Sequence, residues 1–258
     1  MISVEILALL AAAAFVAGFV DSIAGGGGLI ALPALLIAGL DPVSALATNK
    51  LQGSFGTASA TFTFWKSGRL NPQQHLATIA MVFIAACLGV AAVGFAPKQL
   101  LIALLPPLLI GIALYFAFSP SFTNQSSSPR WPAQAFTFFL APLIGFYDGI
   151  FGPGTGSFFM LALVTLFGLG AVEATARTKL FNFTSNIAAL LIFAMGGKIL
   201  WVVGLTMGVA QFFGAQLGAK LAIKNGAKII RPLLVIVCCA MAFKLLSDPA
   251  NPIRALFP

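Results

Sequence analysis

Long apolar runs, separated by short polar breaks, follow one another along the whole chain. Breakers such as Asp41-Pro42, Asn71-Pro72 and Asn225-Gly226 stand between several of them. A bilayer tolerates no unpaired backbone, and a spanning helix needs about 20 residues, so helices are the expected spans. Two short runs, 28–40 and 155–169, are expected to be tilted spans or halves of re-entrant hairpins. The pattern predicts segments at about 4–23, 28–40, 43–65, 72–95, 97–118, 133–151, 155–169, 171–195, 199–223 and 229–247.

Composition agrees with this pattern. Apolar residues make up 60% of the 258 residues and charged residues only 8%, whereas soluble domains carry roughly a quarter charged residues. The net charge of +8 comes from Lys and Arg scattered at segment ends, with no basic tract of the kind that binds nucleic acid. We therefore expect an all-α polytopic membrane protein with eight to ten spans in a lipid bilayer, and no nucleic-acid partner.

The two halves of the chain resemble each other. GFVDSIAGGGG, from Gly18, matches GFYDGIFGPGT, from Gly145; further along, ALATNKL, ending at Leu51, matches ATARTKL, ending at Leu180. A third pair, AACLG and GAQLG, keeps the same order. Three ordered matches indicate duplication. The predicted organisation is a first transmembrane repeat at 1–118, a polar joint at 119–132 and a second repeat at 133–258, each with about five helical segments.

The charges of the loops predict that the second repeat is inverted. In the first half, the loop after the third segment carries Lys66 and Arg69, and the next loop carries only Lys98. In the second half this bias is reversed, with Lys198 alone in the first of the two loops and several basic residues in the next. Because the loop richer in Lys and Arg is normally cytoplasmic, equivalent loops are expected on opposite sides of the membrane.

Glycine-rich stretches lie within the apolar part of both halves, each just after an aspartate. They are expected to break the membrane helix, so that a new helix begins near Gly28 with free backbone amides and a positive dipole end facing an anion. In the second half, Thr155 or Ser157 could cap the new helix. Close helix packing is the alternative role, but recurrence beside an equivalent aspartate favours binding. The candidate residues are Gly25, Gly26, Gly27, Gly28, Gly152, Gly154, Thr155 and Gly156.

Basic residues stand at equivalent places inside the third segment of each half. Lys50 and Lys179 lie some eight residues into their segments, and Arg177 accompanies Lys179. One such lysine could be a helix-end charge reaching the headgroups. Polar residues at helical spacing beside both lysines favour a wet face that lines a cavity or the repeat interface. The remaining candidates for substrate binding are Asn49, Gln52, Thr178, Asn182 and Asn186.

Asp21 and Asp148 precede the two glycine stretches. A buried, ionised carboxylate is costly unless it is paired or reached by water, which suggests proton or cation coupling. A structural cap on the broken helix explains the same position equally well. The sequence leaves both roles open.

The paired GF-x-D-x-I-x-G-x-G blocks, each followed by ATNKL or ARTKL, resemble the TauE/SafE (sulfite exporter) family over about residues 6–246. This resemblance implies a secondary transporter of small anions, such as sulfite, sulfoacetate or other organosulfonates, in the bacterial inner membrane. Alternating access is the expected mechanism, and coupling to protons is left open. An anion channel and, less well supported, a polytopic membrane enzyme are the alternatives. We expect no metal, no cofactor and no catalytic residue, and leave a homo-oligomer open.

The reversed loop charges make a topological prediction. Both termini are expected in the periplasm and the joint around Ser126 in the cytoplasm. Reporter domains that are active only in the periplasm, fused after Gln125 or Pro258, should be silent at the first position and active at the second. A silent fusion at Pro258 would contradict the inverted repeat.

Overall fold

The computed structural model describes residues 3–93 and 123–247, with isolated positions between 107 and 118. Most of the predicted segment 97–118 lies outside the described residues. Within them the regular structure is entirely helical, as the apolar pattern predicts. The helices are α1 (Val4–Ala24), α2 (Gly28–Ile37), α3 (Pro42–Lys66), η1 (Pro72–His75), α4 (Leu76–Ala91), α6 (Ala133–Ala135), η2 (Phe136–Leu140), α7 (Ala141–Ile150), α8 (Thr155–Thr165), α9 (Ala171–Met195), α10 (Trp201–Asn225) and α11 (Ala227–Ser247).

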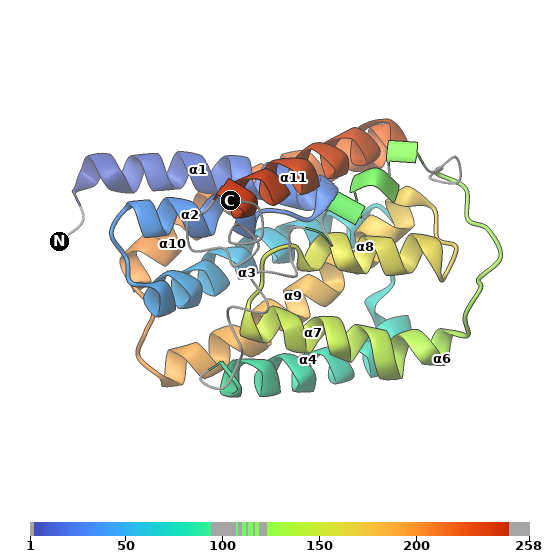
Figure 1. The fold of residues 1–258 in the computed structure, drawn as a ribbon, viewed down its shortest axis with the longest axis horizontal. Coiled ribbons are helices and arrows are strands. Elements are labelled where there is room, and N and C mark those ends of the chain that lie inside the picture. Colours follow the sequence, from blue (N-terminus) through green and yellow to red (C-terminus); the bar gives the residue numbers. More distant parts are fainter. Residues whose placement is uncertain are drawn as a thin grey trace, which may run out of the picture.

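Two helical hairpins enter the molecule from opposite ends of its long axis (Figure 1). The first consists of α1 and α2, and the second of α7 and α8. At 1.5 Å per residue, α2 and α8 are each about 15 Å long, roughly half of a hydrocarbon core. The short runs therefore form the returning arms of hairpins. α1 ends at Ala24 and α2 begins at Gly28, where the glycines predicted the break.

Equivalent helices pair in the same way across the two halves. α1 packs along α10, and α7 packs along α4, while α3 and α9 cross at the centre. The glycines that open the repeated blocks make these contacts close: a Cβ on Gly18 would lie 2.4 Å from the carbonyl oxygen of Gln211, and a Cβ on Gly145 would lie 3.0 Å from that of Val82. This is the arrangement that a duplication predicts.

The basic loops of the two halves lie at one end of the molecule. The hydroxyl of Thr48, near the start of α3, accepts a hydrogen bond from the N–H of Leu200, just before α10, so α3 and α10 run side by side in the same direction. Their last turns carry Lys66 and Lys224. The polar joint lies there too, because Asn124 accepts a hydrogen bond from the N–H that follows α10. That this end faces the cytoplasm stays a prediction.

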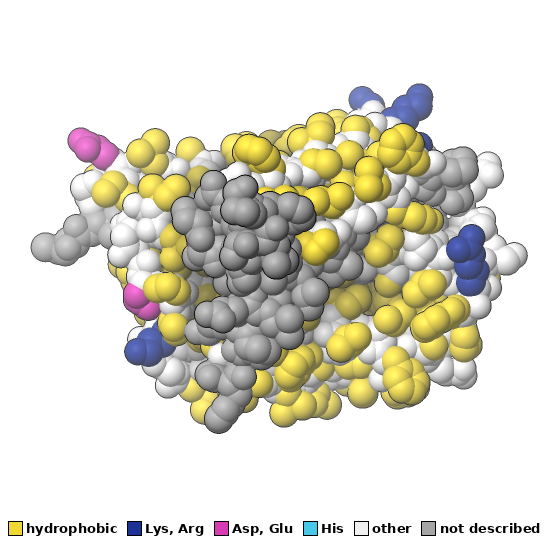
Figure 2. Space-filling view, viewed as in Figure 1, with side chains coloured by type: hydrophobic (Ala, Val, Ile, Leu, Met, Phe, Trp, Pro, Cys, Tyr) yellow, Lys and Arg dark blue, Asp and Glu magenta, His cyan; other side chains and the backbone are white. Residues whose placement is uncertain are grey.

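The outer surface suits a bilayer. Figure 2 shows hydrophobic side chains over most of this face, with charged side chains toward the two ends of the long axis. Among the described residues, five helical stretches are long and apolar enough to cross a membrane, namely Val4–Ala24, Pro72–Ala91, Ala133–Ile150, Ala171–Met195 and Trp201–Asn225. α3 is too polar for that group, and its polar residues are mostly buried. The protein is an all-α polytopic membrane protein; its number of spans stays a prediction.

The tips of the two hairpins touch through glycine. A Cβ built on Gly25 would lie 2.7 Å from the Cα of Gly156, and a Cβ built on Gly156 would lie 2.5 Å from the Cα of Gly25. Gly25 also has a φ of 78°, in the left-handed region. The hydroxyl of Ser157 donates a 3.3 Å hydrogen bond to the carbonyl of Gly25. Two backbones therefore meet where no side chain fits.

This contact predicts which glycine tolerates a methyl group. Gly156→Ala places its Cβ against backbone and should destabilise the protein by about 1–3 kcal/mol, as overpacking does. Gly28→Ala is the matched control, because its Cβ would meet only the amide of Asn49 at an ordinary 3.6 Å. Melting temperatures in detergent should fall by several degrees for the first variant and little for the second. Equal melting temperatures would contradict the close approach.

Candidate functional site

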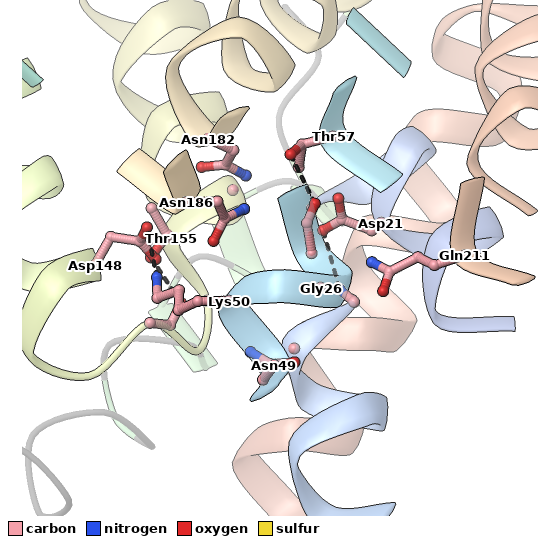
Figure 3. A pocket seen from close by; sticks show the side chains of 17 residues that line it. Asp21, Gly26, Asn49, Lys50, Thr57, Asp148, Thr155, Asn182, Asn186 and Gln211 are labelled. Atoms are coloured by element: carbon pink, nitrogen blue, oxygen red, sulfur yellow. Dashed lines mark hydrogen bonds and ion pairs between the residues drawn. The ribbon is translucent and has the colours of Figure 1, made fainter. Parts of the chain in front are cut away.

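A small polar cavity lies where the hairpin tips meet α3 and α9. Its volume is about 50 Å³, enough for a few water molecules or one small ion. Side chains from both halves surround it (Figure 3). The lining residues are Asp21, Gly25, Gly26, Gly27, Gly28, Asn49, Lys50, Gly53, Thr57, Asp148, Gly152, Gly154, Thr155, Gly156, Asn182, Asn186 and Gln211.

Two ion pairs join the halves at this cavity. The ammonium of Lys50, on α3, lies 2.8 Å from Oδ2 of Asp148, on α7. The ammonium of Lys179, on α9, lies 3.1 Å from Oδ2 of Asp21, on α1. Both lysines are almost fully buried. Each lysine of one half is thus neutralised by the aspartate of the other half, which is what burial of four charges in an apolar bundle requires.

The same aspartates hold the helix breaks. Oδ1 of Asp21 accepts a 3.0 Å hydrogen bond from the N–H of Gly27, the residue before α2. Oδ1 of Asp148 lies 2.8 Å from the hydroxyl of Thr155, the first residue of α8. The expectation that Thr155 or Ser157 caps α8 is wrong: the N-cap is Gly154, and no side chain caps it, since both hydroxyls donate elsewhere. Asp21 therefore combines an ion pair with a hydrogen bond to the backbone before α2, and Asp148 combines an ion pair with a hydrogen bond to the first side chain of α8.

Most hydroxyls on the polar faces bond to their own helix. Ser54 donates to the carbonyl of Lys50, and Thr57 to that of Gly53, which satisfies them without water. Two buried amide oxygens beside the cavity, Oδ1 of Asn182 and Oε1 of Gln211, have no hydrogen-bond partner among the described residues. Because amide oxygen and nitrogen can be exchanged by a flip, these groups offer either acceptors or donors to a bound species.

The structure brings most of the predicted site residues together. The glycines of both stretches line the cavity with Asn49, Lys50, Thr155, Asn182 and Asn186, and so do both aspartates. Four predicted residues do not line it. Gln52 bonds to Asn49, Thr178 is buried beside it, Lys179 reaches only Asp21, and Arg177 pairs with Glu173 on its own helix.

Three lining residues were not among the predicted site: Gly53, Thr57 and Gln211. The first two lie on the polar face of α3, one and two turns beyond Asn49, so their helical spacing from Asn49 indicated that they share its face. Gln211 is 3% exposed on α10. Its signal in the sequence was an amide inside an apolar run, which a membrane helix buries only toward a partner or a cavity.

The fold and this buried polar centre define a helical membrane transporter. Residues 10–245 match the family described as "Sulfite exporter TauE/SafE". The chain belongs to the TauE/SafE family.

Two curated relatives are both named as probable membrane transporter proteins. A "Probable membrane transporter protein ORF9" from Sinorhizobium sp. is 52% identical over 250 residues, which cover 97% of this chain and 96% of the relative. A "Probable membrane transporter protein YfcA" from Escherichia coli (strain K12) is 44% identical over 248 residues, 96% of this chain and 92% of the relative. No solved structure matches the chain.

The crossed ion pairs make a prediction about stability. Lys179→Gln leaves Asp21 buried without its ammonium and should lower the free energy of unfolding by about 3–5 kcal/mol. The double variant Lys179→Gln/Asp21→Asn should recover much of that loss. Melting temperatures of the single and double variants in detergent measure this coupling. The control is Arg177→Gln, which breaks a partly exposed pair within α9 and should cost less than about 1 kcal/mol. If the double variant lost as much stability as Lys179→Gln and Asp21→Asn together, the pairing would be contradicted.

Proposed function

We propose that this protein is a secondary carrier of small sulfur-containing anions, such as sulfite or small organosulfonates, across the bacterial inner membrane. The observation that supports it best is the pair of buried lysines at the cavity. Lys50 lines the cavity directly, and Lys179 stands one carboxylate behind it. A buried ammonium is rare in membrane helices even when it is paired, and its usual reason is a charged substrate or a proton relay.

The helix ends add to this argument. The N-termini of α2 and α8 both face the cavity, since Gly27, Gly28, Gly154 and Thr155 line it. The first N–H groups of a helix lack partners within the helix, and the dipole end is positive. Two such ends with nearby amides from Asn49 and Asn186 suit a small oxyanion, whose oxygens accept several hydrogen bonds at once.

The way in which the two halves meet supports alternating access as the mechanism. The cavity lies between the hairpins, and both ion pairs connect one half to the other. Carriers built from repeats open to each side by moving one repeat against the other around a fixed site. Breaking and remaking Lys50–Asp148 and Lys179–Asp21 would accompany such a motion. A channel, in contrast, needs a continuous open path, and saturable counterflow in proteoliposomes would distinguish a carrier from it.

Charge removal tests the proposed site. Lys50→Met should weaken anion binding by roughly 10- to 150-fold, because a charge-assisted hydrogen bond contributes about 1.5–3 kcal/mol. Lys179→Met should weaken it less, because Lys179 reaches Asp21 and does not line the cavity. Binding is followed as thermal stabilisation of purified protein by sulfite, sulfoacetate, sulfate and chloride, and dissociation constants are then measured for the anions that stabilise it.

Lys198→Met is the matched control, because Lys198 is exposed and does not line the cavity. It should bind with wild-type affinity. Unchanged dissociation constants in Lys50→Met and Lys179→Met would remove the lysines from the site. If none of the four anions stabilises the wild type, the proposed cargo is wrong.

A further inference from the structure

The described charges around the cavity cancel. Lys50 pairs with Asp148 and Lys179 with Asp21. The other titratable groups nearby add no free charge: the hydroxyl of Tyr147 donates to the carbonyl of Pro153, and the thiol of Cys238 donates to Ser157. Arg177 and Glu173 neutralise each other on α9. An anion entering this site therefore meets carboxylates as well as ammonium groups, and no uncompensated cation.

An anion can gain an ammonium only by displacing a carboxylate. The displaced carboxylate would then remain buried, ionised and unpaired, which is strongly unfavourable. A proton removes this obstacle, because a neutral carboxylic acid no longer holds the ammonium. The lysine keeps its own proton throughout, and the only covalent bond made or broken is the O–H of the carboxylic acid. The question is which aspartate accepts the proton.

The two aspartates differ in the partner that each one has. Asp21 faces the backbone N–H of Gly27, which can only donate and therefore offers no acceptor for an O–H on Asp21. Asp148 faces the hydroxyl of Thr155, whose oxygen lies 2.8 Å from Oδ1 of Asp148 and 2.7 Å from the carbonyl of Gly152. A hydroxyl has one hydrogen and can also accept. Thr155 can thus donate to ionised Asp148, or donate to Gly152 and accept from protonated Asp148.

We infer that Asp148 is the coupling-proton site: it takes up one proton when the anion binds, Thr155 switches its hydroxyl toward Gly152, and Lys50 is released to the anion. Asp21 stays ionised and keeps Lys179 and the tip of α2 in place. This inference rests on the proposed anion carrier and assigns its coupling ion. The proton enters from the side that loads the anion and leaves with the anion on the other side.

The test is proton uptake on anion binding in weakly buffered detergent solution, followed with a pH indicator. Sulfoacetate is the main probe, because its carboxyl and sulfonate groups both stay ionised at about pH 7–8; sulfite is the second. Wild type should take up about one proton per sulfoacetate bound. As the pH rises, its dissociation constant for sulfoacetate should increase by up to about tenfold per pH unit. Asp148→Asn should bind with no proton uptake, while Asp21→Asn should keep it.

Thr155 supplies a gentler variant should either asparagine variant fail to fold. Thr155→Ser should keep wild-type proton uptake and pH dependence, whereas Thr155→Val, which removes the hydroxyl partner of Asp148 in both protonation states, should change the pH dependence of binding. Thr165→Val is the matched control on the same helix, because its hydroxyl bonds only to the carbonyl of Leu161. It should behave as wild type.

The outcomes separate the two proposals. Anion binding by wild type without proton uptake would overturn the coupling site and leave the anion carrier standing. Uptake lost in Asp21→Asn but kept in Asp148→Asn would overturn the assignment to Asp148, and so would Thr155→Val that matches Thr165→Val in its pH dependence. If neither sulfoacetate nor sulfite binds wild type at any pH, the anion carrier fails, and the coupling inference fails with it.

Discussion

Four buried charges in an apolar bundle set the main constraint on this protein. Each lysine has its aspartate on the other half, so neither half can bury its own charges alone. The halves must therefore assemble around a shared centre, with α3 and α9 crossing where the ammonium groups reach across. Around this centre, glycines let α1 approach α10 closely, and α7 approach α4.

The aspartates also connect charge to backbone. Asp21 binds the N–H before α2, and Asp148 binds the first residue of α8, so a change in either ion pair acts directly on the start of a short helix. The hairpin tips touch through Gly25 and Gly156. Movement of one hairpin tip therefore displaces the backbone of the other. This gives a physical route by which an event at one carboxylate could alter the packing of both hairpins.

Much of this arrangement could be predicted from the sequence, because duplication places each important residue twice. The apolar runs gave the helices, and the recurring glycines gave the breaks at Gly28 and Thr155. The partners could not be predicted: whether Lys50 faces Asp21 or Asp148 depends on how helices far apart in the chain pack. Arg177 and Lys179 are two residues apart, about 200° around a helix, so only tertiary packing decides which one turns inward.

The two halves share a fold but have diverged at the cavity. Counted from the matched Gly89 and Gly218, Gln211 corresponds to Val82, and Gly53 corresponds to Asn182. Counted from the aspartates, Thr155 corresponds to Gly28, which has no hydroxyl. A symmetric site would treat its two carboxylates alike, since equal surroundings stabilise equal protonation states. Because these differences fall on residues that contact a carboxylate or line the cavity, Asp148 has a hydroxyl partner that can donate or accept, whereas Asp21 has a backbone N–H partner that can only donate.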